Sequence, residues 1–262
     1  MPSPELSIII VSWNVKDLLK KCLESIIKYR GDLTFEIIVV DNASGDGTVE
    51  MIKKEFPQVV LIPNTTNLGF GTANNQGILK SRGDFILVLN PDTVILKDCL
   101  PRMVDFMKSN YQVGIAGCKH LNPDWTLQFS VRRFPSFWPI FLIITKIAKI
   151  FPNLPALSSY LAKDFNYKIA QPVDQVAGSF FLLRKKTLDE IGLFDENFFT
   201  WFEEVDLCRR AVASGWQVWF TPDGEIIHYG GQSFVQQLGV KKQKVFFQSA
   251  LYYFQKHGLN KN

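Results

Sequence analysis

The first half of the chain alternates short apolar runs with amphipathic helical patterns, and this alternation restricts the possible folds more than any other feature. Each run has 4–6 residues rich in Ile, Val and Leu, as is typical of buried strands. The runs are residues 6–11, 35–40, 59–62 and 85–89. Between the first two, Leu19, Cys22 and Ile26 share one helical face. Strands that alternate with helices form βαβ units, so we predict an α/β fold with a mostly parallel central sheet flanked by helices.

The pattern is less regular after about residue 120. An apolar run at residues 176–183 predicts one more strand, and helical patterns cover residues 186–191 and 204–214. No linker rich in Pro, Gly or Ser separates the halves, and 47% hydrophobic residues suffice for one large core. We therefore expect a single domain over residues 1–262.

Charge and cysteine usage exclude some classes of protein. The 29 basic and 25 acidic residues give a net charge of +4, too small an excess for a nucleic-acid-binding surface. The four cysteines lie far apart, without a C-x-x-C pair or a zinc-like arrangement with histidine. The N-terminus has no signal-peptide pattern. We expect a cytoplasmic protein with no nucleic-acid partner.

Residues 134–151, from Phe134 to Phe151, form the most hydrophobic region. Lys146 and Lys149 interrupt it, and its longest uncharged run has 12 residues, too few to span a bilayer. Phe, Trp and Ile beside lysines favour contact with a membrane surface. A buried helix or loop explains the same composition, and the sequence leaves both interpretations open.

Polar residues follow the predicted strands at the sheet edge where open α/β folds bind ligands. Trp13 follows the first strand, and Asp41 and Asn42 follow the second. In this place the Asp41 carboxylate can accept hydrogen bonds from a ribose hydroxyl or a base N–H. The alternative is a cap or turn, because residues 41–47 are rich in turn formers.

The glycine-rich segment 67–77 matches a dinucleotide fingerprint only in part. Asn74 occupies the place of the third glycine, and the segment follows the third strand instead of the first. Its glycines favour close approach of the backbone to a ligand at a helix start, where Asn75 offers neutral hydrogen bonds. A glycine-rich helix start without a ligand is the alternative.

Asp92 and His228 are candidate metal ligands at strand ends. Asp92 emerges from the apolar run 85–89, behind Asn90 and a proline. Such a carboxylate suits Mg²⁺ or Mn²⁺, which take one or two protein carboxylates and bind phosphates and water in their other positions. His228 follows another short apolar run and is a candidate metal or phosphate ligand. A Pro-Asp turn and a structural histidine are the alternatives.

Three carboxylates lie close in sequence, on Glu203, Glu204 and Asp206, directly after the aromatic segment 198–202. Aromatic surroundings exclude water and raise the pKa of a carboxyl group toward that of a usable general base. The same acids also suit the positive N-terminal end of a helix. We predict that one of the three is a catalytic base.

Six segments together resemble the GT-A-type glycosyltransferases of family two, in particular its rhamnosyltransferase-like branch. The segments are residues 11–14, 40–48, 67–77, 90–92, 203–206 and 228–233. Their order and spacing cover nearly the whole chain. The resemblance implies a GT-A fold, with a nucleotide-sugar-binding half at residues 1–120 and an acceptor-side half at residues 121–262.

The resemblance also implies which residues bind the donor. Asp41 would contact the nucleoside, and Val11 and Trp13 would line the base pocket. The full predicted donor-binding set is Val11, Trp13, Asp41, Asn42, Asn75 and Asn90.

A metal site and a base are implied in the same way. Asn90 replaces the first acid of the family's Asp-x-Asp motif, which leaves Asp92 and His228 as the predicted ligands of Mg²⁺ or Mn²⁺. Glu203 and Glu204 match the family's Glu-Asp pair, so Glu204 takes the place of the usual aspartate base.

The activity implied by the resemblance is a metal-dependent, inverting hexosyl transfer. The donor would be a dTDP- or UDP-linked sugar, with L-rhamnose as the sugar that the branch indicates. The acceptor would be a glycan or a polyprenyl-diphosphate-linked glycan in cell-surface polysaccharide synthesis. Such an enzyme would work in the cytoplasm, at the inner face of the cell membrane.

Two other functions compete with this one. Tyr252 and Lys256 have the Tyr-x-x-x-Lys spacing of short-chain dehydrogenases, but no glycine fingerprint follows the first strand. A catalytically impaired homologue that only binds a nucleotide-sugar or glycan would explain Asn90 as decay of the metal site.

Overall fold

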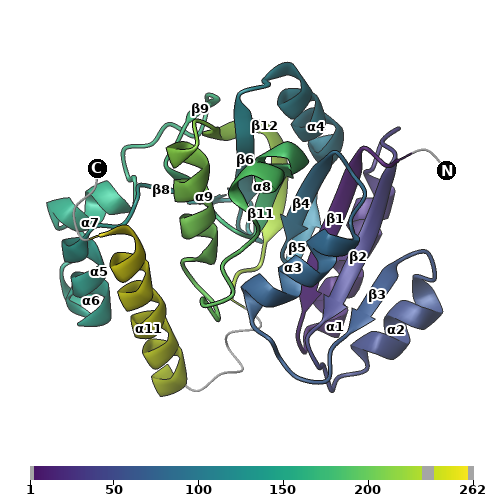
Figure 1. Cartoon of the computed structure of the whole chain (residues 1–262), viewed down its shortest axis with the longest axis horizontal. Helices are drawn as coiled ribbons and strands as arrows, with labels where there is room; N and C mark the ends of the chain where they lie inside the picture. Colours follow the sequence, from purple (N-terminus) through teal and green to yellow (C-terminus); the bar gives the residue numbers. More distant parts are fainter. Residues whose placement is uncertain (1–2, 232–238, 259–262) are drawn as a thin grey trace.

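A computed structural model describes residues 3–231 and 239–258. In this part of the chain a ten-stranded sheet lies at the centre, and helices pack on both faces (Figure 1). The strand order is β3-β2-β1-β4-β11-β6-β12-β5, with β7 beside β6 and β9 beside β12. A second, two-stranded sheet pairs β8 with β10. The strands are β1 (Leu6–Ser12), β2 (Phe35–Asp41), β3 (Val60–Pro63), β4 (Phe85–Leu89), β5 (Thr93–Ile95), β6 (Val113–Leu121), β7 (Leu127–Gln128), β8 (Val131–Arg132), β9 (Gln171–Pro172), β10 (Gln175–Val176), β11 (Phe180–Arg184) and β12 (Gln217–His228).

The four apolar runs of the first half are β1 to β4, which pair in parallel, as predicted. Their ends differ from the predicted ends by at most one residue. In β1, Ile8 and Ile10 pack in the core on one face of the sheet and Ile9 packs in the core on the other. Both faces are covered, so the run is continuously apolar. The expectation of a buried third strand was wrong, because β3 is an edge strand and its Val60 is 46% exposed.

The prediction of one strand over residues 176–183 was also wrong. Its first residue belongs to β10, which pairs with β8 in the small sheet. Its last four residues belong to β11, which is antiparallel to both β4 and β6 in the main sheet. Residues 177–179 connect the two sheets, and an uninterrupted apolar run does not reveal such a change of partner.

The helices complete the two faces of the main sheet. The predicted helices at residues 186–191 and 204–214 are confirmed as α8 and α9, each of which begins one residue earlier than predicted. The helices are α1 (Lys16–Lys28), α2 (Thr48–Glu55), α3 (Phe70–Lys80), α4 (Cys99–Ser109), α5 (Phe137–Ile144), α6 (Ile147–Ile150), α7 (Pro155–Tyr160), α8 (Lys185–Ile191), α9 (Glu203–Ala213) and α11 (Gly239–His257).

The hydrophobic region 134–151 forms α5 and α6, which lie with α7 and α11 at the end of the molecule away from β3 (Figure 1). Ile140 of α5 is buried in a third apolar cluster shared with α9 and α11. On another side of α5, Phe137, Trp138 and Phe141 are 42%, 63% and 40% exposed. The region is therefore a half-buried helical unit. Within the described residues, every helix is too short or too polar to cross a bilayer.

Candidate active site

The ends of β1 and β2 bring Ser12 beside Asp41. Their parallel register pairs the two residues, and the Asn42 N–H donates to the Ser12 carbonyl at 2.8 Å. Asp41 is 1% exposed, and its Oδ2 accepts a hydrogen bond from the Ser44 N–H at 2.9 Å. Asp41 Oδ1 and the Ser12 hydroxyl are buried and have no hydrogen-bond partner among the described residues. Because unpaired buried polar atoms cost free energy, these two atoms indicate a ligand site.

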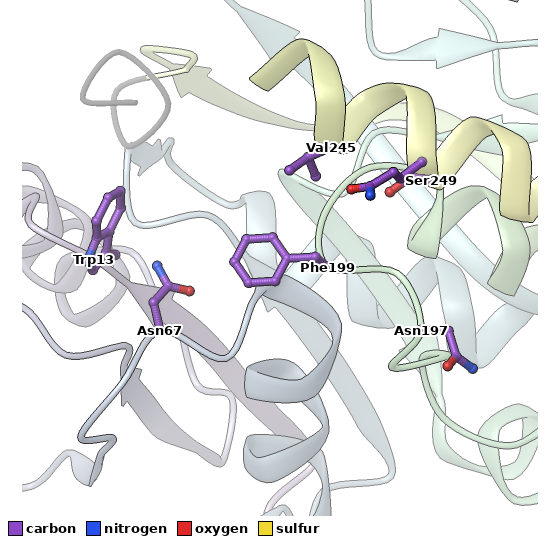
Figure 2. Close-up of a pocket in the computed structure, with 7 residues that line it drawn as sticks. Trp13, Asn67, Asn197, Phe199, Val245 and Ser249 are labelled. Atoms are coloured by element: carbon purple, nitrogen blue, oxygen red, sulfur yellow. The ribbon is translucent and has the colours of Figure 1, made fainter. Parts of the chain in front are cut away.

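A cavity of about 610 Å³ lies at the end of β1 (Figure 2). Trp13 forms one side, and Phe199 and side chains of α11 face it from the other. Its described lining residues are Trp13, Asn67, Asn197, Phe199, Val245, Gln248 and Ser249. A volume of this size admits a nucleotide or a sugar unit. Val11, the other predicted base-pocket residue, is partly exposed near the same strand end.

Asn42 and Asn75 use their side-chain amides within the protein. Asn42 accepts a hydrogen bond from Asn64 Nδ2 at 3.0 Å and donates one to the Gly69 carbonyl at 3.1 Å. Asn75 exchanges two hydrogen bonds with the Phe194 backbone, at 2.9 and 3.1 Å. These amides therefore hold the loops around the site in place.

Gly69 allows two segments of backbone to meet at the start of α3. Its φ is +84°, and an added Cβ would lie 2.4 Å from the Phe199 carbonyl oxygen. The Phe70 N–H donates to that same carbonyl at 2.9 Å. The backbone at this glycine approaches the protein's own Phe199 segment, and the predicted approach of the backbone to a ligand stays a prediction.

Pairing of two distant strands brings Asp92 and His228 together. The end of β12 is antiparallel to β5, and the Tyr229 N–H donates to the Asp92 carbonyl at 2.9 Å. His228 Nε2 lies 3.3 Å from Asp92 Oδ1 without the alignment of a hydrogen bond. Both side chains are largely buried. Residues 232–233, the last of the predicted segment 228–233, lie outside the described residues.

The orientation of the His228 ring favours metal binding. Its Nδ1 lies 2.7 Å from Gln128 Oε1, and Gln128 Nε2 donates to the His228 carbonyl at 3.1 Å. An Nδ1–H that donates to Gln128 leaves the lone pair on the buried Nε2, next to the Asp92 carboxylate. Among the described residues, no three His, Cys, Asp or Glu side chains are arranged so that they could hold a metal ion together. The pair fits Mg²⁺ or Mn²⁺ that fills its other positions with phosphate oxygens and water.

The same edge of the sheet carries Glu204. The Asn90 N–H donates to the Ser179 carbonyl at 3.1 Å, which joins the end of β4 to the 177–179 connection. An added Cβ on Gly178 would lie 3.8 Å from Glu204 Cβ. The structure therefore brings the Asp92–His228 pair and Glu204 to one end of the sheet, although they come from three separate parts of the sequence.

Glu203 and Glu204 differ in their access to solvent. Glu204 is partly exposed, although its Oε2 is buried without a partner. Burial raises the pKa of Glu204, and the positive charge of Arg132 partly opposes this effect. Glu203 is only 4% exposed, and burial together with the charge of Glu204 raises its pKa. An accessible carboxyl group with a raised pKa has the properties of a general base, which favours Glu204.

The structure separates Asp206 from the other two acids. Its side chain is fully buried, and Oδ2 lies 2.8 Å from Arg210 Nε. Oδ1 lies 2.8 Å from Lys256 Nζ and 2.7 Å from His257 Nε2. The carboxylate thus ties α9 to the end of α11, and both of its oxygens are engaged.

Tyr252 and Lys256 also help to hold α11 against the rest of the protein. The Tyr252 hydroxyl donates to Asp195 Oδ2 at 2.9 Å, and Lys256 Nζ lies 2.6 Å from the same oxygen. The Tyr-x-x-x-Lys spacing is therefore explained by structure: both side chains lie on one face of α11 and bind the same carboxylate, that of Asp195.

Sequence reasoning missed His120, Gln128 and Arg132. His120 is 1% exposed, and its Nε2 lies 3.4 Å from Ser179 Oγ. Burial is the main cause that lowers the pKa of His120 to about 3, so its ring is neutral at physiological pH. His120 lies near the end of β6, and a polar residue at a strand end could have been selected as a site candidate from the sequence. The sequence around Gln128 and Arg132 did not mark them as site residues. Gln128 contacts His228 and Arg132 acts on Glu204, and these partners are about 70 to 100 positions away in sequence.

Comparison with known proteins assigns the family. The sequence profile of glycosyl transferase family 2 matches residues 7–192. The chain is 26% identical to the N-acetylglucosaminyl-diphospho-decaprenol L-rhamnosyltransferase of Mycobacterium tuberculosis, over 87% of this chain and 77% of that protein. It is 29% identical to the rhamnosyltransferase WbbL of Escherichia coli, over 85% of this chain and 82% of that protein.

Solved structures agree with the GT-A fold. The mannosyltransferase PcManGT of Pyrobaculum calidifontis, solved with GDP-Man and Mn²⁺, superposes with a TM-score of 0.64 at 17% identity. GalNAc-T7, solved with UDP, GalNAc and Mn²⁺, gives 0.63 at 17% identity. The alignments cover 66% and 44% of those two chains. The family match and the transferase relatives favour an enzyme over the binding-module alternative. The chain is a glycosyltransferase and belongs to glycosyl transferase family 2.

Proposed function

We propose that this chain transfers L-rhamnose from a nucleoside-diphosphate donor to a hydroxyl group of a lipid-diphosphate-linked sugar, with inversion at the anomeric carbon. One observation carries the proposal: a partly exposed carboxyl group with a raised pKa, on Glu204, shares a sheet edge with the Asp92–His228 pair. The names of the mycobacterial and Escherichia coli relatives support rhamnose as the sugar, and the first of them supports the acceptor class. The product would enter cell-surface polysaccharide synthesis.

The donor nucleoside would bind at the ends of β1 and β2. The unpaired Asp41 Oδ1 can accept a hydrogen bond from a pyrimidine N–H or a ribose hydroxyl. Trp13 and Val11 supply apolar contact for the base, and Asn42 and Asn75 act as positioning residues through their loop contacts. These features suit dTDP and UDP alike, and the rhamnosyltransferase relatives favour dTDP.

The reaction is one displacement. Glu204 takes the proton from the acceptor hydroxyl, whose oxygen forms a bond with the anomeric carbon as the bond to the donor diphosphate breaks. Asp92 and His228 would hold Mg²⁺ or Mn²⁺ beside the diphosphate. When bound, such an ion neutralises the charge that develops on the leaving diphosphate. Asn90, which stands in place of a second acid, contributes no charge to this site.

We expect dTDP-L-rhamnose to stabilise the protein against thermal unfolding more than UDP-sugars or GDP-mannose do, and only with Mg²⁺ or Mn²⁺ present. We also expect rhamnose transfer to a synthetic N-acetylglucosaminyl-diphospho-lipid. The measurements are a thermal-shift screen and a radiolabelled transfer assay. If another nucleotide sugar alone gave both the shift and the product, rhamnose would be the wrong sugar. Donor binding without transfer to any acceptor would favour the binding module.

We also propose that the enzyme works at the surface of a membrane, through an aromatic surface made by Phe137, Trp138 and Phe141 of α5. The three exposed rings contact one another, with centroids 5.5–6.0 Å apart. Lys146 and Lys149 follow them and are exposed. Aromatic rings with nearby cations suit the headgroup layer of an anionic bilayer.

Removing this surface is expected to weaken vesicle binding. The double change Trp138→Ser and Phe141→Ser should lower affinity for vesicles of phosphatidylcholine and phosphatidylglycerol at least about 10-fold. The variant lacks two aromatic side chains that the wild type would transfer from water into the bilayer on binding. Sedimentation with vesicles measures this. Trp125→Ser is the matched control, because Trp125 is 62% exposed, like Trp138 at 63%, but lies outside the aromatic surface. Equal vesicle binding by the wild type, the double variant and the control would contradict the proposed membrane contact.

A further inference from the structure

Two adjacent arginines, Arg132 and Arg133, differ in what their side chains contact. Arg133 forms an ion pair with Asp164 at 2.7 Å and donates to the Ser159 carbonyl at 2.9 Å. Arg132 is exposed and makes no ion pair or side-chain hydrogen bond with any residue that the structure describes. Its guanidinium group therefore keeps its N–H donors for an external anion.

The backbone places Arg132 close to Glu204. Arg132 ends β8, which pairs with β10, and β10 packs against α9 and leads directly to Gly178. Gly178 in turn lies beside Glu204, as the added-Cβ distance of 3.8 Å shows. The positive charge of Arg132 also opposes the burial that raises the pKa values of Glu204 and Tyr160, which agrees with this placement.

On its other side, β8 leads to the aromatic surface of α5. In Figure 1 β8 lies between α9 and the group formed by α5, α6 and α7, and the Arg133 N–H donates to the Tyr160 carbonyl of α7 at 3.0 Å. Phe137 follows Arg132 by only five residues, a reach of at most about 18 Å. Arg132 thus stands between the candidate base and an exposed apolar surface.

This order of features matches the order of groups in a lipid-diphosphate-linked sugar. Its hydroxyl is the group to be deprotonated, its diphosphate carries the negative charge, and its hydrocarbon chain needs an apolar environment. We infer that Arg132 binds the acceptor diphosphate and thereby selects lipid-diphosphate-linked sugars over sugars that lack a diphosphate. The inference rests on the proposed function, because it takes Glu204 as the base and Phe137, Trp138 and Phe141 as the lipid-facing surface.

Binding measurements test this role without relying on catalysis. The probes are N-acetylglucosaminyl-diphospho-citronellol and citronellyl N-acetylglucosaminide, which differ only in the diphosphate. We expect the wild type to bind the first more tightly, and Arg132→Gln to weaken that binding about 10- to 100-fold, as for loss of charge-assisted hydrogen bonds. Affinity for the glycoside should not change. Arg132→Lys should keep part of the preference because it keeps the charge.

Arg133→Gln is the matched control, since Arg133 has its own partner in Asp164, and dTDP affinity with Mn²⁺ is the control for the donor site. The inference is overturned if the wild type binds both probes equally, if both arginine variants lose the same affinity, or if Arg132→Gln weakens dTDP binding instead. Transfer activity is scored separately. Arg132-dependent binding without sugar transfer would count against the proposed function alone, and transfer without any diphosphate preference would count against this inference alone.

Discussion

Replacing Glu204 with glutamine is expected to lower the turnover number by about 10²–10⁴-fold while donor binding is unchanged. Glutamine has nearly the same shape but cannot accept the proton of the acceptor hydroxyl. The Glu204 side chain lies beside Gly178, whereas the proposed nucleoside contact, Asp41, lies at the end of β2, so the loss of Glu204 should not affect the nucleoside. Transfer rates at saturating donor and acceptor, together with calorimetric titration of dTDP and Mn²⁺, measure both quantities.

The pH dependence of the wild type provides a second readout of the same residue. A base must be deprotonated to act, and burial raises the pKa of Glu204 above the usual range for a glutamic acid. Turnover should therefore decline as the pH falls through this raised value, at a higher pH than an ordinary glutamate would require. This acid limb should disappear from the residual activity of Glu204→Gln.

Two neighbouring substitutions separate Glu204 from the other acids. Glu203→Gln should reduce turnover much less, because Glu203 is enclosed and 4% exposed. Asp206→Asn should mainly lower the free energy of unfolding, since it removes the charge that binds Arg210, Lys256 and His257. We expect a loss of roughly 1–3 kcal/mol, less than for a wholly buried pair because the cations are partly exposed. A turnover loss greater for either variant than for Glu204→Gln would identify a different base.

Local sequence patterns predicted the parallel half of the fold well, for a physical reason. Strands β1, β2 and β4 are covered on both faces, so burial alone requires an unbroken apolar run at each. The run at 176–183 obeys the same rule but divides between two sheets at residues 177–179. Which strand a segment pairs with depends on residues far away in the chain, here β8 and β4, and hydrophobicity does not encode it.

The candidate site was predictable to the extent that it lies at strand ends. Asp41 ends a buried strand and Asp92 closely follows one, and their position was enough to make them candidates. The local pattern does not rank Glu203, Glu204 and Asp206: contacts with α11 set Asp206 apart, and burial sets Glu203 apart from Glu204. His257, which contacts Asp206, is 51 residues farther along the chain. The contact between His228 and Gln128, 100 residues apart, was equally beyond local reasoning.

Replacing Asp92 with asparagine is expected to reduce kcat/KM about 10³-fold, because the proposed metal site would lose its one carboxylate. Asn90 cannot compensate, since its side chain carries no charge, and His228 would remain as the single protein ligand. Affinity for Mn²⁺ in the presence of dTDP should fall in parallel, measured by titration with electron paramagnetic resonance of free Mn²⁺. The dTDP affinity measured without metal should be unchanged.

The matched control is Asn90→Asp, which adds a carboxylate two residues before Asp92 in sequence and should change Mn²⁺ affinity in the opposite direction. Gln128→Ala tests the ring orientation of His228 and should weaken Mn²⁺ binding about 10- to 100-fold, as for loss of a hydrogen bond that orients a ligand. If Asp92→Asn and Gln128→Ala both bound Mn²⁺ like the wild type, the ion would have to bind elsewhere. An Asp92→Asn variant with unchanged metal affinity but low turnover would instead limit Asp92 to a contact with the sugar or diphosphate.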